Sequence, residues 1–270
     1  MKVARYLALS VAAVLFLIPF YLVLRNGLAS EQEITSPAWT FWPSEIRWEN
    51  FTELFANPAV PLVRSLINSL LVAVLQTVGQ LVLCGLAGYG LARIPYRYTN
   101  VVLYLVIATL MIPAAVTFVP TFVVVSTLGW ISDLRGLVIP GLFSGFTTFL
   151  FRQYFLNFPR EIEEAARMDG LGHWGTYWRV VVPNSKGFFA ALGVIAFITS
   201  WNQFLWPLVI AQDQDSWTVQ VALSTFLTAQ SIEVEQLFLA AAVSITPLVI
   251  VFVALQRFLV RGVTETGIKG

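Results

Sequence analysis

The sequence predicts an all-α membrane protein with six transmembrane helices, and three observations support this fold class. Of its 270 residues, 57% are apolar and only 11% are charged, whereas an ordinary soluble domain has about 25% charged residues. Six apolar runs each reach the length of about 20 residues that a membrane-spanning helix needs. Basic residues also gather in alternate loops between these runs. The runs are residues 6–24, 65–92, 100–128, 137–155, 188–211 and 236–256.

The first run has two interpretations, a transmembrane helix or a signal peptide. Lys2 and Arg5 precede it, and residues 27–29 resemble a weak cleavage site. The run is long for the apolar core of a signal peptide, and more runs of spanning length follow. We therefore expect an uncleaved span.

The second and third runs are longer than a perpendicular helix requires. Tilt, kinks or an extension into the cytoplasm would accommodate the excess length. Pro113 and Pro120 lie within the third run, and proline interrupts helical hydrogen bonding. We therefore expect kinks at these two prolines.

The distribution of charge in the loops predicts the orientation. If the N-terminus is cytoplasmic, 12 of the 16 basic residues lie on the cytoplasmic side, and ten of the fifteen acidic residues lie outside. Positively charged loops remain on the cytoplasmic side. Both termini are therefore expected in the cytoplasm, in a multi-pass membrane protein.

Several classes of function are excluded or disfavoured by composition. The formal net charge of +1 argues against nucleic-acid binding, which needs a basic face. Cys84 is the only cysteine and His173 the only histidine, so neither a disulfide framework nor a metal cluster is expected. The six runs contain no Asp, Glu, Lys or His between their ends, which disfavours a proton-coupled carrier.

Neutral polar and tryptophan side chains occur at depth in the predicted spans, and they have two interpretations. They can hydrogen-bond a polar solute along a transport pathway, or they can join neighbouring helices. The tryptophans can stack on a sugar face or serve as packing or interfacial anchors. The candidate pathway residues are Gln76, Gln80, Thr147, Thr148, Trp201, Asn202, Gln203 and Trp206.

The loop of residues 157–187 is unusually charged for this chain and carries ordered helix signals. Pro159 is suited to a first helical turn, and acidic residues follow it where the helix dipole favours them. Gly170 is a typical left-handed helix stop, and a second short helix over residues 173–181 is expected to end at Pro183. These signals fit a docking element and a connecting loop equally well.

The same loop resembles the EAA loop of permease subunits of ATP-binding-cassette (ABC) importers. The match comprises Glu164-Ala165-Ala166, Asp169-Gly170 and, nine residues later, Val180 and Val182-Pro183. Weaker matches flank it over nearly the whole chain, including Leu91-Ala92-Arg93, Met111-Ile112-Pro113 and a tail from Arg261 to Gly270. The resemblance is greatest to the smaller membrane subunit of maltose-type carbohydrate importers.

This resemblance implies a single permease domain over residues 1–270 that couples ATP hydrolysis by partners to alternating access, for a sugar or polyol. It implies contacts with the ATPase through Glu164, Ala165, Ala166, Asp169, Gly170 and Pro183 of the loop, and through Arg261, Gly262, Lys269 and Gly270 of the tail at residues 258–270. The implied partners are a second permease, two ATP-binding-cassette subunits, an extracytoplasmic substrate-binding protein and membrane lipid, but no nucleic acid.

No catalytic residue or cofactor is expected in this chain, because ATP and Mg would be bound by the partner ATPase. The outer loop at residues 212–235 corresponds to a segment that can contact the binding protein. The alternative function is an ATP-independent carrier or channel for a polar solute. Co-purification with an ATPase would distinguish the two.

Overall fold

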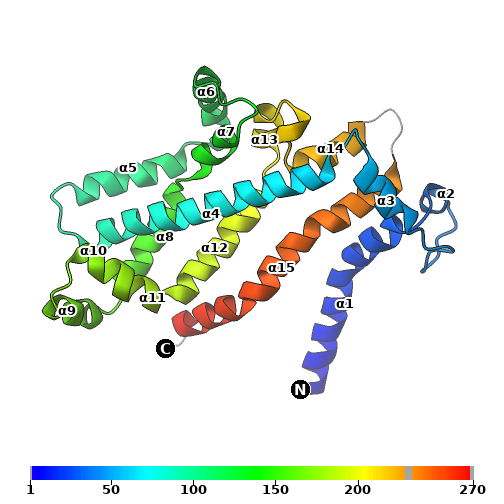
Figure 1. Cartoon of the computed structure of the whole chain (residues 1–270). Coiled ribbons are helices and arrows are strands. Elements are labelled where there is room, and N and C mark those ends of the chain that lie inside the picture. Colours follow the sequence, from blue (N-terminus) through cyan, green and yellow to red (C-terminus); the bar gives the residue numbers. More distant parts are fainter. Residues whose placement is uncertain (1, 229–232, 268–270) are drawn as a thin grey trace. The chain divides into compact units, whose positions relative to one another are not determined.

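The protein is built from helices and loops, with no strand in the described part of the chain (Figure 1). The computed structural model describes residues 2–228 and 233–267. Two compact units divide it: unit 1 comprises Met1–Ile67 and Trp217–Val249, and unit 2 comprises Asn68–Ser216 and Ile250–Gly270. The elements are α1 (Lys2–Gly27), α2 (Glu31–Thr35), α3 (Glu49–Ala56), α4 (Leu62–Arg93), α5 (Thr99–Met111), α6 (Ala114–Thr127), α7 (Leu134–Val138), η1 (Ile139–Gly141), α8 (Gly145–Leu156), α9 (Arg160–Met168), α10 (His173–Thr176), the π-helical turn η2 (Tyr177–Val181), α11 (Val182–Asn184), α12 (Lys186–Trp201), α13 (Leu205–Ile210), η3 (Gln214–Ser216), α14 (Val219–Thr228) and α15 (Val234–Gly267).

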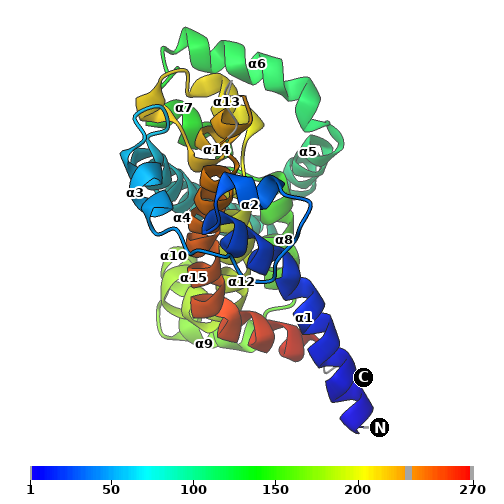
Figure 2. The same ribbon diagram turned by 90° about the vertical axis from the view of Figure 1, so that its right-hand side faces the viewer.

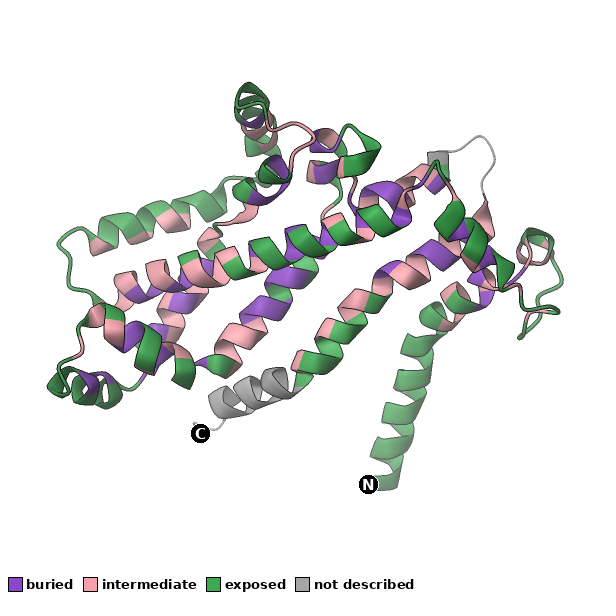
Figure 3. Ribbon diagram, in the orientation of Figure 1, coloured by how far each residue is buried: buried purple, intermediate pink, exposed green. Residues whose placement is uncertain are grey.

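Three helices are long and apolar enough to cross a membrane: α1, α4 and residues Val234–Gln256 of α15. Three further spans are possible if bent pairs of helices are counted, α5 with α6, α7–η1 with α8, and α10–α11 with α12. The bends are 100°, 41° and 81°, respectively. Length and composition therefore allow three to six spans. Most side chains of α1 are exposed (Figure 3), as in a lipid-facing helix.

The third predicted span is broken where Pro113 was expected to kink it. Ile112, the residue before the proline, has extended backbone angles (φ −83°, ψ 117°) and caps α5. This is the region that a following proline imposes on its neighbour. Pro120, by contrast, lies inside α6, and the helix continues through it.

The prediction of one continuous span over residues 188–211 is wrong. Helix α12 ends at Trp201, and a separate short helix, α13, begins at Leu205. Pro207 lies in the first turn of α13. If α12 continued, the ring of Pro207 would clash with the carbonyl of Gln203, four residues earlier. The chain therefore leaves the helix at Asn202 and starts a new one.

Unit 1 is organised around two buried polar side chains. Arg25 pairs with Glu33 at 2.7 Å and donates a hydrogen bond to Thr40 at 2.8 Å. The amide of Asn50 donates to the carbonyls of Gly27 and Ala29 at 3.0 and 3.1 Å. The two bonds of Asn50 satisfy the carbonyl of Gly27, the last residue of α1, and that of Ala29 just beyond it. Together with the Arg25 bonds they fix the chain after its first helix.

Helices α1 and α15 approach closely within unit 1, and Gly27 permits this contact. A Cβ atom at Gly27 would lie 2.9 Å from the Cα atom of Leu239.

The segment of residues 212–235, which gave no sharp motif, contains η3 and α14 in its described part. Several apolar side chains of α14 are buried, including Val221, Ala222 and Phe226.

Unit 2 contains two apolar clusters. One joins α4, α8, η2 and α12 through Cys84, Tyr89, Phe151, Phe155, Phe158, Tyr177, Val181 and Leu192. The other joins α4, α6, α7 and α13 through Val72, Val125, Leu137, Val138 and Ile210. Cys84 is fully buried, and the backbone amide of Ser144 points to its sulfur at 3.3 Å. Figure 2 shows α6, α7 and α13 at the opposite end of this unit from α9.

Helix α7 has a charged N-terminal cap. The carboxylate of Asp133 accepts a hydrogen bond from the backbone amide of Arg135 at 2.7 Å, and it pairs with the guanidinium of the same residue at 2.8 Å. The hydrogen bond from the Arg135 guanidinium, followed by the bond from the Arg135 backbone amide, lowers the pKa of Asp133 to about 2. The cap is therefore ionised over the whole physiological pH range.

Candidate functional site

Helix α9 starts and stops where the sequence predicts. Pro159 caps its N-terminus with extended ψ, and Gly170 has φ of +83°. The amide of Gly170 donates to the Arg167 carbonyl at 2.9 Å, and the amide of Leu171 donates to the Ala166 carbonyl at 3.0 Å. A left-handed glycine that returns these bonds to the last turn is the usual helix stop, so the prediction for Gly170 is confirmed.

The second helix of this loop runs further than expected. It continues from α10 through the π turn η2 to α11 and ends at Asn184, one residue beyond Pro183. The amide of Val182 donates to the carbonyl of Tyr177, five residues back. This π-type hydrogen bond ends one helical segment and starts α11, so Pro183 lies in the first turn of α11. At that position the missing N–H of proline costs no helical bond. The expectation that Pro183 ends the helix is therefore wrong.

One face of α9 is exposed. Glu161, Glu164, Ala165 and Met168 are all exposed, and they recur at the spacing of one helical face. The side chain of Met168 is 89% exposed, although it is large and apolar. It lies one helical turn from Glu164 on the same face. Asp169, Gly170 and Pro183 are exposed as well. The loop therefore offers a mixed acidic and apolar surface.

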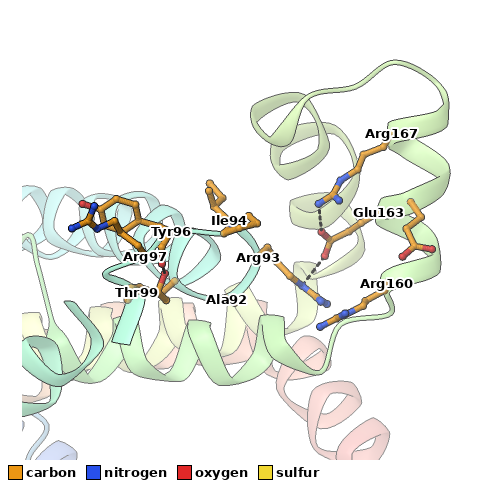
Figure 4. A pocket seen from close by; sticks show the side chains of 12 residues that line it. Ala92, Arg93, Ile94, Tyr96, Arg97, Thr99, Arg160, Glu163 and Arg167 are labelled. Atoms are coloured by element: carbon orange, nitrogen blue, oxygen red, sulfur yellow. Dashed lines mark hydrogen bonds and ion pairs between the residues drawn. The ribbon is translucent and has the colours of Figure 1, made fainter. Parts of the chain in front are cut away.

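The other face of α9 is held by a buried ion pair. Arg93 stands at the end of α4, and its Nε atom lies 2.9 Å from Oε1 of Glu163. The two side chains are 5% and 4% exposed, respectively. The hydroxyl of Tyr89 donates to Glu163 at 3.3 Å, and Arg167 lies 3.9 Å away on the outer side. Arg93 also donates to the Phe158 carbonyl. Figure 4 shows Glu163 between Arg93 and Arg167.

The residues that follow α9 pack into the larger apolar cluster of unit 2. Tyr177 and Val181 of η2 are buried there, and the ring centroids of Tyr177 and Tyr89 lie 5.0 Å apart. Trp174 and Trp178 lie at the surface in an edge contact. The loop is thus anchored by the ion pair of Glu163 with Arg93 and by buried side chains such as Tyr177 and Val181, while the Glu164 face of α9 points outward.

A second candidate site is a cavity of about 190 Å³ in unit 2. It brings together three of the eight predicted pathway residues, Gln76, Gln203 and Trp206. Threonines of α6 and the η1 turn complete its wall. The full lining is Gln76, Ala114, Thr117, Phe118, Thr121, Pro140, Gly141, Gln203 and Trp206.

The other predicted pathway residues do not line this cavity. Gln80 donates to the Gly141 carbonyl at 2.8 Å and meets Thr147 at 3.5 Å. Thr148 donates to the Ser144 carbonyl at 2.9 Å. Trp201 is buried against Phe197. The exposed side chain of Asn202 donates to the Ile198 carbonyl at 2.9 Å. Gln76 itself donates to the Leu137 carbonyl at 2.9 Å, so it also joins helices.

The predicted tail contacts are only partly covered by the structure. Arg261 and Gly262 lie in the backbone of α15, and Lys269 and Gly270 lie outside the described residues. Over the described ranges, no group of three or more His, Cys, Asp or Glu side chains could hold a metal ion.

Sequence reasoning missed the pairing of Glu163 with Arg93. Glu163 was interpreted only as an acid near a helix N-terminus, and Arg93 only as a cytoplasmic charge. A signal was present, because Glu163 and Ala166 follow the helical spacing i and i+3. A small residue on that face indicates close packing, and a glutamate beside it needs a buried partner.

Comparison with known proteins identifies the family. The family model described as "Binding-protein-dependent transport system inner membrane component" matches residues 84–265. The chain belongs to this family. It is the permease subunit of an ABC importer, an all-helical, multi-pass protein of the inner membrane, and the ATP-independent alternative is not favoured.

Similar proteins cover the permease almost from end to end. It is 31% identical to the sn-glycerol-3-phosphate transport system permease protein UgpE of Yersinia pestis, with 97% of this chain and 95% of that protein covered. It is 29% identical to the arabinooligosaccharides permease AraQ of Bacillus subtilis (100% and 96% covered) and 31% identical to the lactose permease LacG of Rhizobium radiobacter (96% and 94%).

The fold also matches a solved structure. The permease superposes on a chain of a bacterial ABC transporter involved in the import of the acidic polysaccharide alginate, with a TM-score of 0.83. The sequence identity is 22%, and 96% of each chain is covered. This likeness shows the same helical fold over the matched 96% of the chain.

Proposed function

We propose that this permease imports a carbohydrate or a related neutral polyol and that α9 couples it to ATP hydrolysis by partner subunits. The observation that carries the coupling role is the division of α9 into two faces. Its Glu163 face is locked to α4, and its Glu164 face is exposed beside Met168. A rigid, exposed helix end fits the cleft of a partner, and it can transmit the partner's movement to α4.

The proposed contacts with the ATPase are those of the loop at residues 157–187 and of the tail. Glu164 meets a basic group of the ATPase, and the small side chain of Ala165 lets the partner approach this face closely. Ala166 is buried on the other face of α9, so it supports the surface from inside rather than contacting the ATPase as the sequence predicted. Asp169, Gly170 and Pro183 shape the turns around the helix. The tail residues Arg261, Gly262, Lys269 and Gly270 add a second contact. ATP and Mg are bound by the partner, and both termini of the permease lie on the same, cytoplasmic side.

The proposed substrate class rests on the cavity of about 190 Å³. Gln76, Gln203 and the threonines of its wall supply donors and acceptors without charge, and Trp206 supplies an aromatic face. The indole nitrogen of Trp206 is fixed by a bond of 3.0 Å to the Gly136 carbonyl, so the ring is held in place. Such a lining suits hydroxyl-rich neutral solutes. The similar permeases are named for sugars or for glycerol phosphate.

The complete importer is proposed to contain a second permease, two ATPase subunits and an extracytoplasmic binding protein. Alternating access then follows if the closed and open ATPase dimers favour different tilts of the helices attached to α9. The outer segment of residues 212–235 is the proposed contact with the binding protein.

The coupling role is tested by Glu164→Lys in the complex that co-purifies with this chain in nanodiscs. Loss of ATP hydrolysis stimulated by binding protein and sugar is expected, with the membrane fold retained. Glu53→Lys, a charge reversal at an exposed position on α3, is the matched control and is expected to keep stimulation. Full stimulation in Glu164→Lys would refute the coupling role.

The substrate pathway is tested separately with Gln203→Leu and Trp206→Leu. Each should reduce uptake of the substrate by about tenfold, because one good hydrogen bond or stacking contact contributes about 1–1.5 kcal/mol. ATP hydrolysis stimulated by the binding protein should persist. Unchanged uptake in both variants would remove this cavity from the pathway.

A further inference from the structure

A larger cavity of about 760 Å³ lies in unit 2, and the buried ion pair of Glu163 and Arg93 forms part of its wall. The wall comes from the end of α4, from the connection to α5 and from α9, where Glu164 of the proposed coupling role also lines it (Figure 4). The lining is Leu91, Ala92, Arg93, Ile94, Pro95, Tyr96, Arg97, Thr99, Arg160, Glu163, Glu164 and Arg167.

The wall carries an excess of positive charge. Of its six charged side chains, four are arginines and two are glutamates. Glu163 is compensated by Arg93 at 2.9 Å and by Arg167 at 3.9 Å. Over the part of the chain that the structure covers, Arg97 and Arg160 have no carboxylate within ion-pair distance. The charge that would complete this wall is therefore an anion.

The two uncompensated arginines differ in how they are held. The guanidinium of Arg97 lies 4.3 Å from the ring centroid of Tyr98 and donates to its hydroxyl. Arg160 begins α9 and is exposed. In Figure 4 the two side chains lie on opposite sides of Arg93. Guanidinium groups suit phosphate oxygens because each presents several N–H donors in one plane.

The position of the cavity favours a lipid as the source of this anion. It lies where α4 ends and α5 begins, at the predicted cytoplasmic ends of two spans. Ile94, Tyr96 and Tyr98 are exposed there, and aromatic side chains are enriched at the membrane–water interface. Basic cavities between transmembrane helices on the cytoplasmic side bind anionic lipid headgroups.

We propose that this cavity binds an anionic phospholipid headgroup, which is attracted by the positive charges of Arg97 and Arg160 at its two ends. The bound lipid bridges the α4–α5 connection and the start of α9, so it steadies the helix that carries Glu164. Binding requires only that the chain is inserted in a membrane. The effect on ATP hydrolysis rests on the proposed coupling role of α9.

The test measures phosphatidylglycerol binding to the full-length chain, with its co-purifying subunits, in nanodiscs. Native mass spectrometry follows the lipid retained as phosphatidylglycerol is titrated into phosphatidylcholine. Arg97→Gln and Arg160→Gln are each expected to weaken binding about fivefold, and the double variant about 25-fold, because one arginine near an anionic surface contributes about that factor. Arg160→Lys, which keeps the charge, should recover part of the affinity.

Arg179→Gln is the matched control, since it removes an exposed arginine of the same loop that does not line the cavity. It should change binding less than twofold. The proposal is overturned if Arg97→Gln and Arg160→Gln bind phosphatidylglycerol as the control does. It is also overturned if inorganic phosphate binds in phosphatidylcholine discs while phosphatidylglycerol is not retained. A third contrary result is that the variants keep wild-type lipid binding and lose only their association with the ATPase subunit.

A separate readout distinguishes this proposal from the proposed function. ATP hydrolysis is measured in phosphatidylcholine discs with and without phosphatidylglycerol. Binding that depends on Arg97 and Arg160 supports the lipid site even if hydrolysis does not respond to the lipid. In that case the coupling role of α9 is judged by Glu164→Lys alone.

Discussion

Replacing Glu163 by glutamine removes one charge from the ion pair that holds α9 on α4. Both side chains are about 95% buried and lie 2.9 Å apart. The change leaves the guanidinium of Arg93 buried beside the Phe158 carbonyl, without a counter-charge. Removing one partner of such a pair costs about 3–5 kcal/mol. The docked state of α9 should therefore lose stability by a factor of about 150 to about 5,000.

Hydrogen exchange of the α9 amides measures this loss directly, because their protection reports local opening. In Glu163→Gln the protection of the α9 amides should fall by a factor of about 150 to about 5,000. ATP hydrolysis should no longer respond to binding protein and sugar. Glu161→Gln removes an exposed carboxylate from the same helix and should leave the protection of the α9 amides unchanged.

A second variant separates loss of charge from loss of packing. The double change Glu163→Met with Arg93→Met removes both charges and keeps apolar volume, and such replacements are often neutral or stabilising. Protection of α9 should recover relative to Glu163→Gln. If Glu163→Gln keeps wild-type protection and full coupling, the ion pair does not hold α9, and the reasoning fails.

Three further perturbations test individual features. Gly170→Ala, at φ +83°, should cost about 1–2 kcal/mol and lower the melting temperature of the permease. Gly141→Ala places a Cβ atom 2.4 Å from the side-chain nitrogen of Gln76, so it should displace that amide and reduce uptake more than ATP hydrolysis. The pKa of Asp133 is lowered to about 2 by its bonds with Arg135. Its stabilising effect is therefore fully present above about pH 4 and is lost as pH falls through 2, measured as faster amide exchange in α7 after correction for intrinsic rates.

Two controls accompany these tests. Gly90→Ala adds the same methyl group within α4 where nothing lies within 4 Å, so it should leave uptake unchanged. Asp133→Asn keeps a capping oxygen without a titratable group, so its amide exchange should show no transition between pH 4 and 2. A wild-type melting temperature in Gly170→Ala would contradict the strain argument for the left-handed turn.

Local sequence signals predicted those parts of the fold that depend on neighbouring residues. Apolar length indicated α1, α4 and α15, and Pro113 indicated the break between α5 and α6. Gly170 indicated the end of α9. In each case the cause lies within a few residues of its effect, so the sequence displays it directly.

Features that depend on distant residues could not be predicted in the same way. The partner of Glu163 lies on another helix, and only the fold brings Arg93 to it. The break after Trp201 was overlooked although Pro207 signals it, because the apolar run continues through it. Of the pathway residues, only those beside α6 and η1 share a cavity, and that grouping depends on how three separated segments pack.

The burial of Cys84 makes the protein convenient for spectroscopy. It is the only cysteine of the chain, it is fully buried, and its sulfur lies against the backbone of Ser144. A buried thiol reacts slowly with maleimides, because reaction needs an exposed thiolate. A single cysteine introduced on the exposed face of α9, at Ala165 for example, could then carry a fluorophore or spin label without prior removal of the native thiol. Movements of this helix during a transport cycle thus become measurable in an otherwise unmodified chain.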